Sequence, residues 1–114
     1  MDYHGNDFYC DVALKDTAPI KIVSETSNVL AFHHTNPSWP LHIVVVPKKH
    51  IPSLLALSKG DNEILLEMID IIKVLAARVV QEYGGARILS NVGVYQDSKH
   101  LHFHICYGEQ IQKG

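Results

Sequence analysis

The sequence has little cysteine, little net charge and no long apolar run. Cys10 and Cys106 are the only cysteines in 114 residues. Two cysteines cannot build the disulfide framework of a small secreted domain, so we expect a reduced, cytoplasmic protein. The first residues also lack the basic and then apolar pattern of a signal peptide. No apolar run approaches the roughly 20 residues of a membrane span, so we expect no membrane partner.

The formal net charge is only −2, which gives no global attraction to the phosphates of a nucleic acid. We therefore expect no nucleic-acid partner. A chain of 114 residues with 46% hydrophobic residues is typical of one globular domain, here over residues 1–114. Histidine is the residue in excess, with eight copies, several of them clustered.

One long helix is predicted over residues 61–83, because apolar side chains recur there at helical spacing. Asp61 suits the N-cap of this helix, and Gly84 and Gly85 suit its end. A short N-terminal helix is predicted over residues 7–14.

Short runs of β-branched and apolar residues predict five strands, at residues 20–24, 28–33, 41–46, 87–91 and 100–107. The first two form a hairpin in this prediction, because turn residues separate them. Strands, one long helix and further strands, in that order, indicate an α+β domain with a mainly antiparallel five-stranded sheet.

The last predicted strand carries three alternate histidines, His100, His102 and His104, separated by Leu101 and Phe103. Alternate side chains of a strand share one face, so the imidazoles line one face while the apolar residues enter a core. Imidazole can act as a nucleophile, an acid or base, or a metal ligand. Alternate residues of a flat strand lie about 6.5–7 Å apart, so one metal ion cannot bind all three without distortion. Three imidazoles on one face of a strand nevertheless favour a functional site over three unrelated surface histidines.

This histidine pattern resembles the signature of the histidine triad (HIT) family, and the likeness covers about residues 7–108. It extends to residues 29–32, to the segment from His42 to His50 that includes Pro47, and to Asn91 and Gln96 before the triad. The Hint-like branch is the most similar. The resemblance implies a HIT-like fold and a homodimer.

The resemblance also implies a mechanism. His102 attacks the α-phosphorus of a nucleoside 5′-phosphoramidate or a related nucleotidyl conjugate and forms a nucleotidyl-histidine, which water then hydrolyses. The attacking ring nitrogen must be neutral, and a backbone carbonyl of the same strand holds the other ring nitrogen. The implied supporting residues are His42 and His100 beside the nucleophile, His104 and Asn91 at the phosphate, Gln96 at the phosphate or bridging atom, and Phe32 at the base.

Two positions depart from the family pattern. His34 stands where many Hint-type proteins have an acidic residue that holds the ribose hydroxyls, and one imidazole cannot replace a bidentate carboxylate. In the loop before the triad, Asp97 falls where a hydroxyl usually assists the leaving group. Ser98 supplies this hydroxyl if the loop shifts.

A structural zinc ion is the one cofactor that the resemblance raises, and the reaction itself requires none. Some bacterial relatives bind zinc at positions that correspond here to Asp7, Cys10, His50 and His100. The alternative is a degenerate site in which Cys10 is simply buried.

Three other functions stay open at this point. A dinucleoside polyphosphate hydrolase would use the same chemistry at His102 with a different leaving group. A non-catalytic zinc or protein-interaction module would keep the fold without turnover. A nucleic-acid deadenylase resembling aprataxin predicts a basic surface, which the net charge of −2 does not favour.

Overall fold

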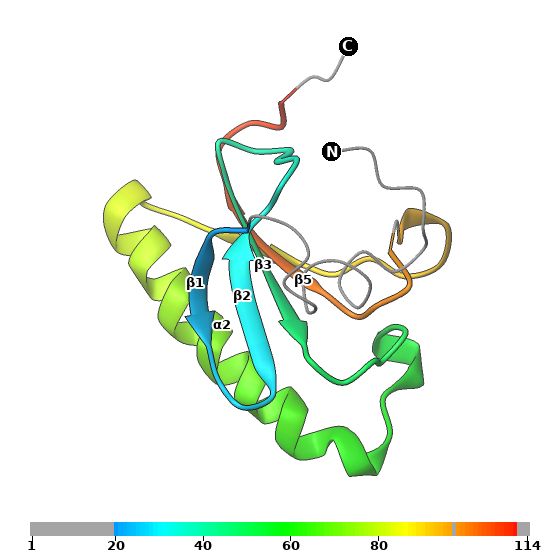
Figure 1. Cartoon of the computed structure of the whole chain (residues 1–114). Helices are drawn as coiled ribbons and strands as arrows, with labels where there is room; N and C mark the ends of the chain where they lie inside the picture. Colours follow the sequence, from blue (N-terminus) through cyan, green and yellow to red (C-terminus); the bar gives the residue numbers. More distant parts are fainter. Residues whose placement is uncertain (1–19, 97, 112–114) are drawn as a thin grey trace.

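The computed structural model describes residues 20–96 and 98–111. Five strands and one long helix make up the described fold (Figure 1), namely β1 (Ile22–Glu25), β2 (Val29–His33), β3 (Leu41–Pro47), α2 (Asn62–Tyr83), β4 (Arg87–Leu89) and β5 (Phe103–Tyr107). Short 3-10 turns are η2 (Leu54–Ala56), η3 (Lys59–Asp61) and η4 (Gly93–Tyr95). The short helix predicted over residues 7–14 lies outside the described residues.

The strands form one sheet in the order β1-β2-β3-β5-β4, with every neighbouring pair antiparallel. The predicted hairpin is confirmed by the pairing of β1 with β2. Helix α2 crosses behind the sheet in Figure 1 and covers one of its faces. The predicted α+β fold with a five-stranded antiparallel sheet is therefore confirmed.

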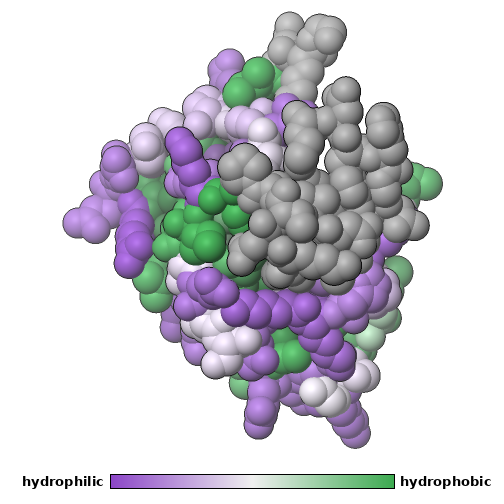
Figure 2. All heavy atoms as spheres, viewed as in Figure 1, coloured by the Kyte–Doolittle hydropathy of each residue, from purple (hydrophilic) through white to green (hydrophobic). Residues whose placement is uncertain are grey.

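Side-chain alternation along the strands separates a helix face from a site face. On β3, Ile43 and Val45 pack under α2, whereas Val44 and Val46 belong to a second cluster on the opposite face. The helix-face core joins these strand residues to the apolar stripe of α2, which consists of Met68, Ile71, Ile72, Leu75 and Val79. The site face is the one turned to the viewer in Figure 2, where hydrophilic side chains surround a small apolar area.

The ends of α2 follow the prediction in position but differ in their chemistry. Gly84 adopts a left-handed conformation with φ 97°, and its N–H donates to Val80 O over 2.8 Å. Asp61 occupies the N-cap, yet its carboxylate accepts hydrogen bonds from Ser58 N, Ser58 Oγ and Lys49 Nζ instead of from the first turn of the helix. These contacts, led by the one from Lys49, lower the pKa of Asp61.

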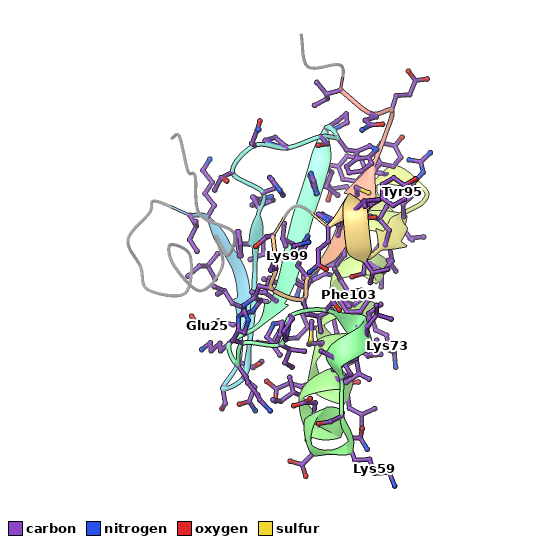
Figure 3. All side chains as sticks on the ribbon, turned by 90° about the vertical axis from the view of Figure 1, so that its right-hand side faces the viewer. Glu25, Lys59, Lys73, Tyr95, Lys99 and Phe103 are labelled. Atoms are coloured by element: carbon purple, nitrogen blue, oxygen red, sulfur yellow. The ribbon has the colours of Figure 1, made fainter. Side chains whose placement is uncertain are left out.

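Six strand boundaries differ from the prediction by one to three residues, and two of these differences lie in the segments that lead to the candidate site. The last strand begins at Phe103 and not at His100, because Leu101 N–H donates to Ile51 O over 2.6 Å and leaves the sheet register. Strand β4 ends at Leu89, two residues earlier than predicted. Even so, Leu101, Phe103 and Ile105 join the core under α2 as the alternation predicts. Figure 3 shows Phe103 on the side of the sheet that α2 covers.

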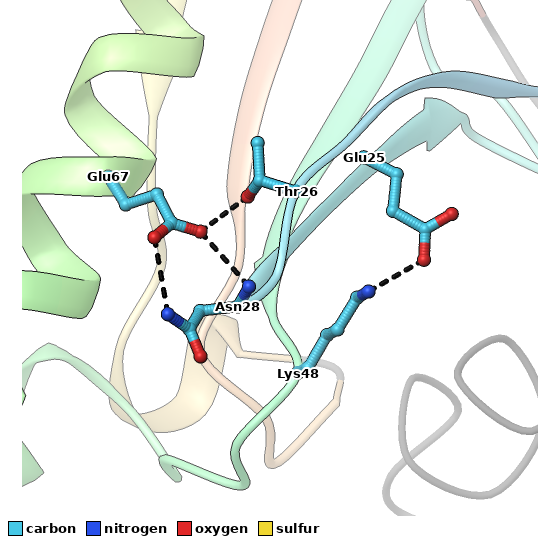
Figure 4. Close-up of polar contacts among 5 residues, drawn as sticks. All are labelled: Glu25, Thr26, Asn28, Lys48 and Glu67. Carbon is cyan, nitrogen blue, oxygen red and sulfur yellow. Dashed lines mark hydrogen bonds and ion pairs between the residues drawn. The ribbon is translucent and has the colours of Figure 1, made fainter.

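A carboxylate on α2 ties the β1–β2 turn to the helix (Figure 4). Glu67 accepts hydrogen bonds from Thr26 Oγ1, from Asn28 N over 3.0 Å and from Asn28 Nδ2 over 3.2 Å. These hydrogen bonds, led by the one from Thr26, hold the pKa of Glu67 below its ordinary value of 4.5. Lys48, directly after β3, places its Nζ 2.6 Å from Oε2 of Glu25 at the end of β1. The hairpin is thus fixed to the helix by polar contacts at its tip.

Among the described residues, no helix is both long and apolar enough to cross a bilayer.

We expect Glu67→Gln to lower the melting temperature at neutral pH and to weaken the acid sensitivity of the fold. The native carboxylate stabilises the folded state above the unfolded pKa near 4.5, and this contribution disappears as the pH falls through the lower folded pKa. Thermal unfolding between about pH 6 and pH 3 measures it. Asp70→Asn on the same helix is the control, and equal pH dependence in both variants would contradict the role of Glu67.

We expect Leu101→Ala to reduce the free energy of unfolding by about 2–5 kcal/mol, because it removes a large side chain from a packed core. Leu101 is 1% exposed, whereas Leu55 is 82% exposed. Leu55→Ala is therefore the matched control, with an expected change within about 0.5 kcal/mol. Urea unfolding measures both. Similar values for the two variants would show that the segment before β5 is not anchored in the core.

Candidate active site

Four imidazoles gather on the site face of the sheet, which we call the histidine cluster: His34, His42, His102 and His104. His42 lies on β3 and His104 on β5, while His102 precedes β5 and His34 follows β2. The ring centroids are 4.3 Å apart for His34 and His42, 4.9 Å for His42 and His104, and 4.8 Å for His104 and His102. The rings therefore form a continuous chain of contacts.

The backbone fixes the protonation of two of these rings. The amide of Ser38 donates to His42 Nδ1 over 3.0 Å, so the proton of neutral His42 lies on Nε2. That Nε2 lies 2.7 Å from His104 Nδ1 and donates to it. His104 must then carry its own proton on Nε2. A single backbone amide thus determines which nitrogen of His104 is a hydrogen-bond donor.

His102 has the opposite arrangement. Its Nδ1 lies 2.7 Å from the carbonyl oxygen of His100, and a carbonyl only accepts, so Nδ1 carries the proton. The lone pair of the neutral ring is therefore on Nε2. This carbonyl is the acceptor that the family resemblance implies. Ser90 Oγ donates to the carbonyl oxygen of His102 over 2.7 Å and holds the same stretch of backbone.

Ser90 is a residue that the sequence analysis missed. Its only signal is its place at the end of the predicted strand 87–91, a position that many serines occupy for turn formation alone. Its role depends on the approach of two segments 12 residues apart, which no local pattern encodes.

His100 lies in the segment before β5 and is hydrogen-bonded to the end of β3. It is fully buried, and its Nε2 donates to the carbonyl oxygen of Pro47 over 2.7 Å. Its ring lies 5.2 Å from that of His50. The prediction that all three triad imidazoles line one strand face is therefore too simple, because strand pairing begins only after His102.

Burial keeps His104 neutral. The side chain is 7% exposed, and desolvation, reinforced by the neighbouring His102, His42 and His34, lowers the pKa of His104 to about 3. At neutral pH this imidazole is an uncharged donor through Nε2–H. It can stabilise charge on an oxygen atom without first losing or gaining a proton.

The loop before the triad holds two further candidate residues. Gln96 is 7% exposed and its Nε2 donates to the carbonyl oxygen of Pro52 over 2.6 Å. Lys99 Nζ lies 3.4 Å from the carbonyl oxygen of Gln96, and Figure 3 labels Lys99 in this loop. Ser98 Oγ is buried and, in the part of the chain that the structure describes, has no hydrogen-bond partner. Such an orphaned hydroxyl costs free energy and suits a group that meets a ligand.

The remaining predicted substrate residues are Asn91 and Phe32. Asn91 is half-buried, two residues after β4 ends. Phe32 is 1% exposed and packs in the second apolar cluster, on the same sheet face as Val44. Val44 is the register partner of His104, so Phe32 and the imidazoles share one face.

The predicted zinc ligands fall into two groups. Asp7 and Cys10 lie outside the described residues. Within residues 20–96 and 98–111, no group of three or more histidine, cysteine, aspartate or glutamate side chains is arranged to hold a metal ion. His50 and His100 are adjacent, and the bond from His100 Nε2–H to a backbone carbonyl is typical of histidines that ligate a metal through the other nitrogen. These two side chains therefore fit half of such a site.

The model of the HIT domain family matches residues 15–111. The chain belongs to the HIT family. A HIT-like protein of Buchnera aphidicola subsp. Baizongia pistaciae is 32% identical over 102 residues, which are 88% of this chain and 91% of that protein. Adenosine 5′-monophosphoramidase HINT3 of Danio rerio is 32% identical over 98 residues, covering 85% of this chain and 61% of that protein.

Solved structures of HIT proteins have the same fold. The HIT family hydrolase from Legionella pneumophila Philadelphia 1 superposes with a TM-score of 0.79 at 30% identity, over 94% of this chain and 96% of that chain. A histidine triad protein from Clostridium difficile gives a TM-score of 0.74 at 31% identity, over 99% of both chains. The predicted HIT-like fold is thereby confirmed.

We expect His104→Asn to flatten the pH dependence of folding stability. The unfolded imidazole titrates near 6.5 and the folded one near 3, so the unfolded state binds more protons between these values and stability falls with the pH. This group alone accounts for a loss of about 2 kcal/mol between about pH 7 and pH 5. Urea unfolding at both pH values measures the slope. His33→Asn, at an exposed position, is the control, and an unchanged slope in His104→Asn would contradict the assignment.

Proposed function

We propose that this protein is a hydrolase that cleaves nucleoside 5′-phosphoramidates, or related nucleotidyl conjugates, at the α-phosphate. The observation that carries the proposal is the hydrogen bond from His102 Nδ1 to the carbonyl oxygen of His100, which places the lone pair on Nε2. The neutral Nε2–H of His104 is next to this nucleophile, with the two rings 4.8 Å apart. Membership of the HIT family and the similarity to HINT3 support it.

In the first step, His102 Nε2 attacks the α-phosphorus and the bond from phosphorus to the leaving nitrogen breaks. The leaving nitrogen keeps the electron pair of that bond and takes up a proton from solvent. The positive charge that develops on the His102 ring is stabilised through Nδ1–H by the carbonyl of His100. In the second step water attacks the phosphorus of the nucleotidyl-histidine and loses a proton to solvent. The bond from phosphorus to Nε2 breaks, its electron pair returns to Nε2, and the nucleoside monophosphate leaves.

Charge on the phosphoryl oxygens needs donors that are already oriented. His104 Nε2–H supplies one, because His42 accepts from the Ser38 amide and donates to His104 Nδ1. We assign Asn91 and Gln96 to the same phosphate. The buried hydroxyl of Ser98 is assigned to the leaving group, where a partner would satisfy its unmet hydrogen bond.

A dinucleoside polyphosphate hydrolase is the second candidate, since the same nucleophile serves it. A non-catalytic zinc or interaction module is the third, and it predicts no turnover at all. Turnover of a phosphoramidate compared with diadenosine tetraphosphate separates these possibilities.

We also propose that the protein forms a homodimer. Val80 and Tyr83 on α2 and Ile88 on the edge strand β4 are 49%, 43% and 49% exposed. Tyr83 stacks on Tyr107 of β5, with centroids 4.9 Å apart, which joins the helix surface to the sheet. Apolar surface of this kind beside a sheet edge suits association with a second copy.

We expect His102→Ala to reduce the release of AMP from adenosine 5′-phosphoramidate by more than about a thousand-fold, the scale seen when a covalent nucleophile is removed. A chromatographic assay of AMP measures it. His33→Ala, which removes an exposed imidazole next to the cluster, is the matched control and keeps most of the activity. Circular dichroism and thermal unfolding check that both variants are folded.

Near-normal release by folded His102→Ala would contradict the nucleophile assignment. Release of AMP from diadenosine tetraphosphate but not from the phosphoramidate would favour the polyphosphate hydrolase. No turnover of either substrate by the native protein would favour the interaction module.

A further inference from the structure

A cavity of about 420 Å³ opens beside the histidine cluster. Its described lining residues are Ile20, Lys21, His33, His34 and Thr35. None of these five is acidic, whereas one is cationic and three others carry polar hydrogen-bonding groups. A concave site that combines a lysine with imidazole and hydroxyl groups has the chemistry of a phosphate site.

We propose that this cavity binds a second phosphate group of the substrate, separate from the α-phosphate at His102. The inference rests on the proposed function and extends it. Lys21 provides the charge, and the imidazoles of His33 and His34 with the hydroxyl of Thr35 provide directional hydrogen bonds. Lysine binds phosphate as a point charge, so the neighbouring donors supply the geometry.

His34 connects the cavity to the active site. Its ring stacks on His42 with 4.3 Å between centroids and an interplanar angle of 21°, and its centroid lies 6.2 Å from that of His104. His34 therefore lies at the cavity end of the histidine cluster and His102 at the other end, so a substrate bound at His102 extends along the cluster toward the cavity.

The backbone also fixes the tautomer of His34. The amide of Asn36 donates to His34 Nδ1 over 2.9 Å, so the neutral ring carries its proton on Nε2. The imidazole is then a hydrogen-bond donor even without a positive charge. A carboxylate at this position would repel a phosphate, whereas the Nε2–H of His34 can donate a hydrogen bond to a phosphate oxygen.

Two kinds of substrate carry a suitable second phosphate. It can be a phosphate monoester on the ribose, or a distal phosphate of a 5′-polyphosphate chain. The cavity recognises the same group in both cases, so the choice is made by experiment with adenosine 3′,5′-bisphosphate and ADP, each compared with AMP.

The test is isothermal titration calorimetry of the full chain with these three nucleotides, which requires no turnover. We expect one of the two-phosphate nucleotides to bind about tenfold or more tightly than AMP, the size of one charge-assisted hydrogen bond. A preference for the bisphosphate identifies a ribose phosphate, and a preference for ADP identifies the polyphosphate chain. Lys21→Ala and His34→Asn remove most of this advantage, and Lys21→Ala, which lies outside the histidine cluster, leaves the affinity for AMP nearly unchanged. Lys73→Ala, on an exposed position of α2 (Figure 3), is the control and retains it.

Equal affinity for all three nucleotides would overturn the inference while leaving the proposed function intact. An advantage that survives in Lys21→Ala and His34→Asn would also overturn it, because the second phosphate would then bind elsewhere. Absence of AMP binding together with absence of AMP release from the phosphoramidate would instead overturn the proposed function, on which the inference rests.

Discussion

The active site depends on how residues 100–102 are held before the last strand begins. Leu101 N–H donates to Ile51 O, His100 Nε2 donates to Pro47 O, and Ser90 Oγ donates to His102 O. Within this fixed stretch, the carbonyl of His100 receives the proton of His102 Nδ1. These contacts keep the carbonyl of His100 in place, and with it the choice of the nitrogen of His102 that carries the lone pair.

The helix-face core determines the orientation of His104 through the register of β3 and β5. Val44 is paired with His104 in this register, and Ile43 with Ile105, so the imidazole faces away from α2 whenever the isoleucines face it. A shift by one residue would bury His104 under the helix and expose Ile105. The helix-face core therefore stabilises the arrangement of the histidines although it lies on the opposite face of the sheet. The strand register that buries Ile105 is thus the same register that orients His104.

Much of the fold was predictable from local pattern, because long helical periodicity and β-branched runs are strong signals. The helix over residues 61–83 and the hairpin of β1 and β2 are examples. The strand start at His100 was predicted wrongly, because alternation of residue types continues across His100 and His102 while the hydrogen bonds of the sheet do not. The hydrogen bond of Leu101 to Ile51 joins segments 50 residues apart, and no local pattern reports it.

The candidate site shows the same division. The triad, His42 and Gln96 were predicted as site residues from their types and their order along the chain, which the sequence shows directly. The position of His34 on the ring of His42 required coordinates, because seven residues separate them in the chain. Asp61 is the N-cap of α2 as predicted, but its carboxylate binds Ser58 and Lys49 instead of the helix amides, which the sequence pattern does not predict.

The imidazoles are oriented largely by atoms of the main chain: the amide of Ser38 and the carbonyls of His100 and Pro47. A main-chain atom is the same in every residue type. Position 38 can therefore change its side chain during evolution without releasing His42, provided that the path of the loop is kept. Selection then acts on the shape of the backbone and on the histidines themselves, and most other positions can diverge. The superposition of a protein 30% identical with a TM-score of 0.79 agrees with this dependence on backbone shape.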